Sequence, residues 1–235
     1  MKTLLDVYSL KARLFPAFIV LLPAVLAILA WLPEATLLTS SYLGAGLAAA
    51  LSFFITELVR DGGHRKQSQL WESWGGPPTT QLLRWSNQQV NPHLRMKWRA
   101  AIEELTGKKL PSANSESRNP SKADQAYEAA VTELRMKSRM AESGSLFFKE
   151  NVSYGFRRNL WGMKPAGILI ATLALISSTF TCVRKSAHGF DHPPSLLAVL
   201  LAAILLSIWL LRIHPRWVRE KADAYAEQLL GSLLQ

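Results

Sequence analysis

Four long blocks without a charged residue constrain this chain more than any other feature. Residues 14–32, 35–56, 165–183 and 193–211 contain no Asp, Glu, Lys or Arg over 19, 22, 19 and 19 positions. A helix that crosses the roughly 30 Å hydrocarbon core of a bilayer needs about 20 mostly apolar residues. Buried helices of soluble domains are normally shorter and amphipathic. We therefore expect four membrane-spanning helices.

The distribution of Lys and Arg predicts the topology. The segment before the first block has three of these residues, the first connector none, residues 60–164 eighteen, the second connector two and the C-terminal tail four. Cytoplasmic segments of membrane proteins carry the excess of Lys and Arg. We therefore expect a multi-pass protein of the bacterial inner (plasma) membrane, with both termini and the central segment in the cytoplasm. The alternative, a cleaved signal peptide at the first block, is disfavoured by the block's length.

These features predict an all-α polytopic protein with a helical cytoplasmic domain inserted between helices 2 and 3. Its expected parts are an N-terminal transmembrane pair (1–59), a basic helical domain (60–164), a C-terminal transmembrane pair (165–212) and an amphipathic tail helix (213–235). The tail's apolar stripe comprises Val218, Ala222, Tyr225, Leu229 and Leu233. We expect it to be buried against the central domain, a partner chain or the membrane surface.

Local signals predict three helices in the central segment. Asn91 is a suitable N-cap, and Gly107 a suitable end, for a first helix with Pro92 at its first position. Its expected apolar face comprises Leu94, Trp98, Ala101, Ile102 and Leu105. A loop is expected over 108–120. Ser121 and Asp124 have the spacing of a capping box for a second helix. The expected apolar face of that helix comprises Ala123, Tyr127, Ala130, Val131 and Leu134. A third helix is expected near 146–161, before the third block.

The central segment also carries most of the positive charge. Residues 60–164 have a net charge of +8, out of +10 for the whole chain, and such a balance suits anionic partners. Three stretches place cations near glycines or aromatic rings: 61–66, 71–84 and 150–159. In the second of these, Thr79 or Thr80 could cap a helix whose free N–H groups face an anion. We expect phosphate to be bound by Arg65, Lys66, Arg84, Arg95, Arg99, Arg157 and Arg158. We expect bases to stack on Trp74, Trp98 or Tyr154.

Each of these stretches also has a structural interpretation. Residues 61–66 could be a glycine helix stop with cations on lipid headgroups, and 71–80 a rigid turn packed by two tryptophans. Residues 150–159 could be an interfacial aromatic and basic belt. Arg95 and Arg99 could be a solvated helix face. These alternatives stay open at this level.

A small and polar face in the second block suggests a conduction path. The expected pore-lining residues are Ser41, Ala45, Ala48, Ser52, Thr56 and Glu57. The alternative is a close helix–helix contact, which favours the same residue types. Because four spans of one chain leave little room for a conduction path, conduction would require a homo-oligomer, with a tetramer as our first expectation.

Catalytic chemistry is hard to build from this sequence. We find no motif for a hydrolase, a metalloprotease or a nucleotide-binding loop, and Asp61 with His64 is the sole acid–base pair worth testing. The single cysteine, Cys182, excludes a disulfide framework within one chain. We expect no enzyme activity, no cofactor and no metal site.

The layout of two spans, a basic helical domain and two further spans, with 61–84 and 150–164 as its distinctive stretches, resembles the small membrane effectors of bacterial antiphage systems. The Hailong-type effector is the nearest of these. The resemblance implies a pore gated by a nucleotide or single-stranded oligonucleotide and a partner nucleotidyltransferase that supplies the signal. It assigns no individual residue. Two alternatives are a membrane scaffold or assembly protein that binds a protein partner and an enzyme that acts on a lipid phosphate.

Overall fold

A computed structural model describes residues 7–31, 42–138, 145–187 and 193–234 of the chain. Within these ranges the protein is all-helical and contains no strand. The chain divides into two compact units. Unit 1 comprises 1–67 and 155–218, and unit 2 comprises 68–154 and 219–235. All three boundaries between the units fall inside continuous helices. They differ from the predicted domain limits after residues 59, 164 and 212, which stay a prediction.

Unit 1 contains the apolar helices. They are α1 (Val7–Ser9), the π-helix η1 (Leu10–Leu14), α2 (Phe15–Trp31), α10 (Pro193–Ser207), the π-helix η2 (Ile208–Arg212), and parts of α4 (Tyr42–Trp74) and α9 (Leu146–Ala187). Three described helical stretches are long and apolar enough to cross a membrane: Val7–Leu29, Leu146–Ala187 and Ser195–Arg212. They contain most of the first predicted span, all of the third and nearly all of the fourth. The protein is therefore membrane-embedded.

The second predicted span is only partly described. Residues 35–41 lie outside the described part of the chain, and α4 begins at Tyr42. The number of four spans therefore stays a prediction. Ser41, the first expected pore-lining residue, lies outside the described residues, and Ala45 and Ala48 lie in α4.

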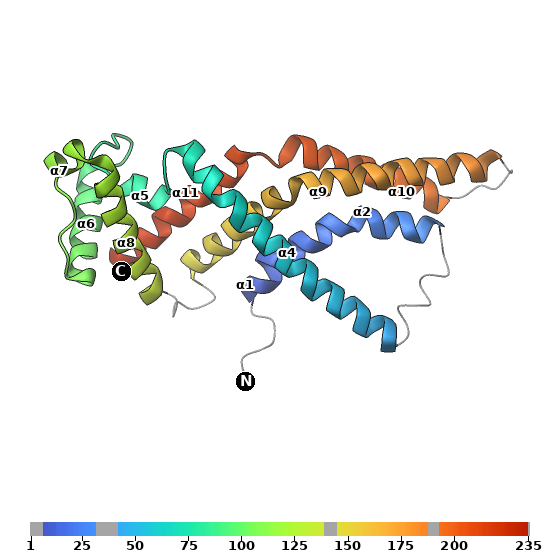
Figure 1. Ribbon diagram of the computed structural model, residues 1–235, viewed down its shortest axis with the longest axis horizontal. Helices are drawn as coiled ribbons and strands as arrows, with labels where there is room; N and C mark the ends of the chain where they lie inside the picture. The colour runs from blue at the N-terminus through green and yellow to red at the C-terminus, as the bar shows by residue number, and fades with distance from the viewer. Residues whose placement is uncertain (1–6, 32–41, 139–144, 188–192, 235) are drawn as a thin grey trace. The chain divides into compact units, whose positions relative to one another are not determined.

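Small side chains hold the apolar helices together. Ala27 of α2, Ala174 of α9 and Ala202 of α10 form a buried cluster, with Leu175 packed against it. Figure 1 shows the ribbons of these three helices side by side. Side chains of this size let helix backbones approach closely, which is the usual basis of helix association in a bilayer. The larger apolar side chains of these helices, such as Phe18, Leu173 and Leu200, are exposed, as expected for surfaces that contact lipid.

The glycines after the second block do not stop the helix. The single helix α4 continues through Gly62 and Gly63 to Trp74, so the predicted helix stop at 61–66 is wrong. A Cβ at Gly63 would overlap the side chain of Asn159, and a Cβ at Gly162 would overlap the backbone of Gly62. These glycines are thus needed for a close crossing of α4 and α9, and not for a turn.

Unit 2 has a compact apolar core built from short helices. They are α5 (Pro78–Leu83), α6 (Pro92–Thr106), α7 (Ala113–Arg118), α8 (Pro120–Ser138) and most of α11 (Pro215–Gly231), followed by the 3-10 helix η3 (Ser232–Leu234). The buried core includes Trp98 and Ile102 of α6 and the whole predicted face of α8: Ala123, Tyr127, Ala130, Val131 and Leu134. Leu94, expected on the buried face of α6, is instead exposed.

The helix limits confirm one predicted cap and correct another. The Asn91 side chain accepts hydrogen bonds from the first turn of α6, and Gly107 ends the helix in the left-handed conformation with φ +66°. In contrast, α8 starts at Pro120, and the Asn119 side chain accepts from the Lys122 backbone N–H at 3.0 Å. The predicted Ser121–Asp124 capping box is therefore wrong.

Two further predicted limits differ from the structure. The expected loop over 108–120 contains α7, which is capped by the Ser112 side chain. The expected third helix and third span are one continuous helix, α9, which includes Pro165. A proline removes one backbone hydrogen bond without necessarily ending a helix.

The tail helix is packed within its own chain. Leu229 and Leu230 are fully buried in the core of unit 2, and Tyr225 and Leu233 pack against that core. For Tyr225, Leu229 and Leu233, the structure therefore selects the central helical domain among the three predicted burial partners; Val218 and Ala222 are buried outside this core.

Candidate functional site

The arginines expected to bind phosphate from α6 are inside unit 2. Arg95 and Arg99 are only 7% and 5% exposed, so the solvated-face alternative is wrong for both. Arg95 Nη1 donates to the carbonyl of Asn87 at 2.6 Å and to that of Arg84 at 3.2 Å. Arg99 donates to the carbonyls of Leu83 and Pro111 and to the Tyr127 hydroxyl.

These two guanidinium groups are also stacked on Trp85. Their central carbons lie 5.4 Å (Arg95) and 4.4 Å (Arg99) from the Trp85 ring centroid. The indole Nε1 of Trp85 donates to the Pro111 carbonyl at 3.0 Å. Buried arginines are tolerated when their N–H groups are bonded and their planes are covered by aromatic rings. Arg95 and Arg99 thus fix the loop between α5 and α6.

A buried carboxylate is bonded to the same loop. Glu116 accepts from the backbone N–H groups of Trp85 and Ser86, at 2.9 and 3.0 Å, and from the Tyr127 hydroxyl at 2.7 Å. Burial raises the pKa of Glu116, but these hydrogen bonds outweigh it, so its pKa is lowered. Burial and the bond to Glu116 raise the pKa of Tyr127 to about 12.

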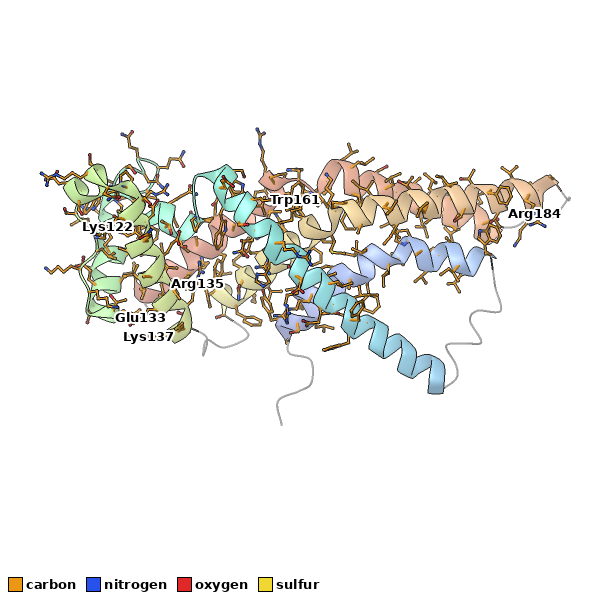
Figure 2. The ribbon with its side chains drawn as sticks, viewed as in Figure 1. Lys122, Glu133, Arg135, Lys137, Trp161 and Arg184 are labelled. Carbon is orange, nitrogen blue, oxygen red and sulfur yellow. The ribbon has the colours of Figure 1, made fainter. Side chains whose placement is uncertain are left out.

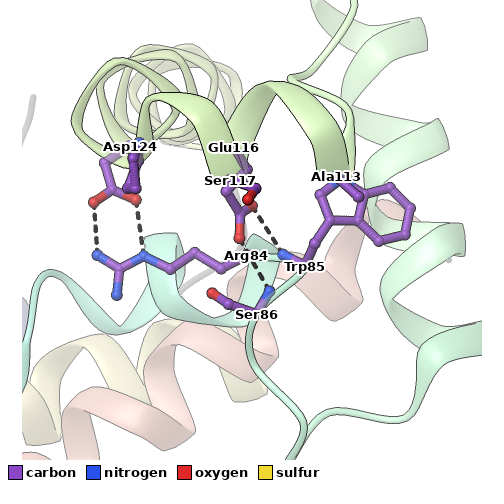
Figure 3. Close-up of a pocket in the computed structure, with 8 residues that line it drawn as sticks. Arg84, Trp85, Ser86, Ala113, Glu116, Ser117 and Asp124 are labelled. Carbon is purple, nitrogen blue, oxygen red and sulfur yellow. Dashed lines mark hydrogen bonds and ion pairs between the residues drawn. The ribbon is translucent and has the colours of Figure 1, made fainter.

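A surface pocket of about 550 Å³ opens beside this network (Figure 3). It is formed by the end of α5 with the loop that follows, by α7 and by the first turns of α8. Its lining consists of Arg84, Trp85, Ser86, Ala113, Glu116, Ser117, Pro120 and Asp124. All eight residues belong to unit 2.

Arg84 is held in this pocket by a two-point ion pair. Its Nε and Nη2 donate to the two carboxylate oxygens of Asp124 at 2.8 and 2.7 Å, as Figure 3 shows. The bond to Asp124 raises the pKa of Arg84. The Nη1 edge lies outside this two-point pair, and the pair fixes the plane of the guanidinium. Three of the predicted phosphate-binding residues lie in unit 2: Arg84, Arg95 and Arg99. Of these three, Arg84 alone lines the pocket.

The remaining predicted cations lie in unit 1. Arg65 is exposed and Lys66 half-buried on α4. Arg157 Nη1 donates to the Trp217 carbonyl at 2.6 Å, and the Arg157 guanidinium stacks on the Trp217 ring. Arg158 is 7% exposed and donates to the side chains of Asn159 and Gln67. The predicted phosphate-binding residues thus form separate groups in the two units.

The predicted stacking residues are covered by their own chain. Trp98 is in the core of unit 2, and Tyr154 stacks on Tyr225 with ring centroids 6.0 Å apart. Trp74 is buried at the end of α4, and Arg219 lies over its ring at 5.9 Å. The aromatic ring that lines the pocket is Trp85, which is not one of the predicted stacking residues. The one sequence feature that points to Trp85 is its position directly after Arg84, a predicted phosphate-binding residue.

The glycine–proline segment after α4 is a tight turn. Gly75 and Gly76 have φ values of +81° and +122°, and Gly76 donates to the Trp71 carbonyl at 2.7 Å. The helix that follows, α5, has six residues and Pro77 as its N-cap. The turn comprises only 75–77, because 71–74 belong to α4 and 78–80 to α5, so the alternative of a rigid turn at 71–80 is confirmed only in this central part. The predicted caps Thr79 and Thr80 are buried inside α5.

Two of the expected pore-lining residues, Thr56 and Glu57, bond to residues of their own helix, α4. The Thr56 hydroxyl donates to the Ser52 carbonyl at 2.6 Å, and Glu57 pairs with Arg60 at 2.6 Å. The assignment of Ser52, Thr56 and Glu57 to a pore stays a prediction.

Comparison with known proteins finds no matching family model, no matching curated protein and no matching solved structure.

Proposed function

We propose that this chain is a membrane effector whose cytoplasmic helical domain binds a nucleotide or single-stranded oligonucleotide. In this proposal the bound ligand controls an oligomeric pore or ion channel formed by the membrane-spanning helices. The biological role is antiviral defence, with a partner nucleotidyltransferase as the source of the signal. The protein itself performs no catalysis.

The Arg84 pocket is the observation that carries this proposal. Its volume of about 550 Å³ is within the range of about 300–1,000 Å³ that is usual for small-molecule sites. It combines a fixed guanidinium with the Trp85 ring and with Ser86 and Ser117. A guanidinium edge can bind phosphate, an aromatic ring can stack on a base, and hydroxyls can bond to sugar or phosphate oxygens.

The charged residues of the lining sum to −1, so the attraction of an anion rests on exposed cations next to it in the sequence. The lining carries Arg84 against Glu116 and Asp124, but both carboxylates are already bonded within the chain. Arg118 and Lys122 are exposed on the two helices that contribute Ser117, Pro120 and Asp124, and Lys122 lies near the start of α8 (Figure 2). We therefore assign the phosphate attraction to Arg84, Arg118 and Lys122.

This assignment changes which variants test ligand binding. Replacement of Arg95 or Arg99 would remove buried hydrogen bonds and would test the fold of unit 2. Arg118→Glu combined with Lys122→Glu reverses two exposed charges within two residues of the lining residues Ser117, Pro120 and Asp124. Lys108→Glu combined with Lys109→Glu makes the same charge change at two exposed residues that are at least four positions from any lining residue in the sequence, and is the matched control.

The test is binding of fluorescent short single-stranded DNA and of cyclic nucleotides to the full chain in detergent at several salt concentrations. Each neutralised single-strand phosphate contributes about −0.7 to the slope of log affinity against log salt. We expect the Arg118/Lys122 variant to lose about two contacts, so its slope should be shallower by about 1.4, whereas the control should retain most of its affinity. Equal binding by both variants would exclude the pocket.

Ion flux through liposomes that contain the purified chain tests the effector role. The proposal requires flux that changes when the same ligand is added. It also requires a homo-oligomer, because a single chain has too few spanning helices to enclose a pore. A folded protein that binds no nucleotide and conducts no ion would contradict the proposal and would favour a membrane scaffold.

A further inference from the structure

The spanning stretch Ser195–Arg212 in unit 1 has an apolar groove of about 440 Å³ on its exposed side. The side that packs against the other helices is buried through Ser195, Ala198, Ala202 and Trp209. The walls of the groove are the exposed side chains of Leu200, Ile204, Ile208 and Leu211. The small side chains of Ala203 and Ser207 leave the space between these walls, and Arg212 lines one end.

The length and position of the groove match one leaflet of a bilayer. From Leu200 to Arg212 the helix rises about 18 Å, and half of the hydrocarbon core of a bilayer is about 15 Å thick. Arg212 is the first charged residue after the uncharged block 193–211, so it lies where the hydrocarbon ends and the headgroups begin. An acyl chain in the groove therefore brings its headgroup to Arg212.

An aromatic ring holds the Arg212 guanidinium at this end of the groove. The central carbon of the guanidinium lies 5.6 Å from the Trp217 ring centroid. Trp217 is itself fixed, because its backbone N–H donates to His214 Nδ1 at 3.2 Å and its carbonyl accepts from Arg157 Nη1 at 2.6 Å. The Arg157 guanidinium lies 4.8 Å from the same ring centroid. Two cations thus share one buried tryptophan.

The fold leaves the positive charge of Arg212 available. Arg212 is exposed, and it forms no ion pair with a carboxylate in the described part of the chain. The carbonyls at the end of a helix carry partial negative charge. At the end of η2 they are bonded by Lys164, whose Nζ donates to Ile213 O at 2.6 Å and to Leu210 O at 3.4 Å. Arg216, in the first turn of α11, is a second exposed cation.

We propose that this groove binds an anionic phospholipid, with an acyl chain along the apolar walls and the phosphate at Arg212. A guanidinium bonds well to phosphate oxygens. A zwitterionic lipid such as phosphatidylcholine has the same phosphate, but its choline adds a positive charge beside Arg212 and Arg216. The site lies in unit 1, goes beyond the proposed function and is independent of the pocket in unit 2.

Charge favours a lipid over a second copy of the chain in this groove. Small residues four positions apart, such as Ala203 and Ser207, are also typical of contacts between membrane helices. However, copies in one membrane share the same orientation, so a two-fold contact through this face would place Arg212 beside Arg212. An anionic headgroup avoids that repulsion. An interface between copies is therefore the alternative outcome of the test.

The experiment is native mass spectrometry of the full chain in neutral detergent, with phosphatidylglycerol and phosphatidylcholine of identical acyl chains as probes. Ser207→Leu fills the groove, and Thr179→Leu on α9 is its matched control. Both hydroxyls belong to exposed residues and bond to the carbonyl four residues earlier. Of these two residues, Ser207 lines the groove and Thr179 does not.

A second pair of variants tests the charge. Arg212→Gln removes the cation at the end of the groove, and Arg184→Gln is its matched control. Arg184 is in the last turn of α9 (Figure 2), about 30 Å along that helix from Lys164, which bonds to the end of η2. The control therefore removes the same charge at the opposite end of the paired helices.

We expect the parent and both controls to bind phosphatidylglycerol more tightly than phosphatidylcholine. Arg212→Gln should weaken phosphatidylglycerol binding about fivefold and leave phosphatidylcholine binding nearly unchanged, because it removes the charge and keeps the groove. Ser207→Leu should weaken both lipids about fivefold or more, because the acyl chain loses its space. The two variants thus separate the contribution of the headgroup from that of the groove.

Three results would overturn the site: equal binding of the two lipids by the parent, equal losses in Arg212→Gln and its control, or equal losses in Ser207→Leu and its control. Dissociation of an oligomer by Ser207→Leu with unchanged lipid binding would also overturn it and would identify the groove as an interface between copies.

A measurement on the parent alone keeps the test decisive if a variant does not fold. Because Arg212 is exposed, the preference for phosphatidylglycerol should decrease as the ionic strength rises. A preference that does not change with salt would contradict a headgroup contact with Arg212. None of these readouts depends on nucleotide binding or ion flux, so this site and the proposed function fail separately.

Discussion

At the scale of single residues, the most informative feature is a set of basic side chains with partners inside the fold. Arg95 and Arg99 donate to backbone carbonyls at the ends of neighbouring helices and stack on Trp85. Each such bond contributes about 1 kcal/mol, but a buried acceptor that loses its donor costs more. These two positive charges are therefore structural, and a ligand must use cations that are exposed.

Replacement of Tyr127 by Phe tests the hydrogen bonds of Glu116. The change removes a donor from Glu116 and an acceptor from Arg99. We expect the free energy of unfolding to fall by about 1–3 kcal/mol, measured by thermal unfolding of the full chain in detergent. Tyr154→Phe makes the same chemical change at a tyrosine that stacks on Tyr225, and should cost less.

The same tyrosine predicts a loss of stability at alkaline pH. Its pKa is raised to about 12 in the folded chain, whereas an unfolded tyrosine ionises near pH 10. Between these values the unfolded state releases a proton that the folded state retains, so the free energy of unfolding decreases as the pH rises from about 10 to about 12. Tyr127→Phe should flatten this part of the pH profile. A parallel decline in the variant would assign the loss to other groups.

At the scale of elements, glycine and proline act through contacts between helices. In α4 and α9 the glycines allow a crossing in which backbone meets backbone. In the first helix Pro16 leaves the Ala12 carbonyl to accept from Asn159. Residues that weaken isolated helices therefore determine here how the helices pack.

Gly162→Ala tests this crossing. A Cβ at Gly162 would overlap the backbone of Gly62, and overpacking of this kind costs about 1–3 kcal/mol or more. We expect a lower Tm in detergent, followed by tryptophan fluorescence. Gly231→Ala is the matched control, because a Cβ there meets no atom within 4 Å and alanine favours a helix by about 0.5–1 kcal/mol. Equal effects of the two changes would exclude the crossing.

At the scale of the whole molecule, the question is how many helices cross the bilayer. Three described helical stretches have the length and composition for it, and a fourth span over residues 35–56 is a prediction. An even number of spans puts both termini on one side, whereas an odd number puts them on opposite sides. Topology thus tests the span count directly.

Reporter fusions give this answer. With four spans and both ends inside, a fluorescent protein fused before Met1 or after Gln235 should be active. Alkaline phosphatase, which requires an oxidising compartment, should be active when inserted at Gly189. Activity of the phosphatase at one terminus together with fluorescence at the other would show an odd number of spans, and residues 35–56 would then not cross.

The sequence by itself determined the helical class, the membrane-spanning stretches found in the structure, the limits of α6 and the buried face of α8. These features depend on local composition, periodicity and capping, which a short window of sequence contains. Only the tertiary structure decided that Arg95 and Arg99 are buried, that Arg84 pairs with Asp124 forty residues away, that Gly62 and Gly63 pack instead of ending a helix, and that the tail is part of the core of unit 2. The physical reason is that burial, hydrogen-bond partners and close backbone contacts depend on residues brought together from distant parts of the chain, which local sequence patterns do not identify.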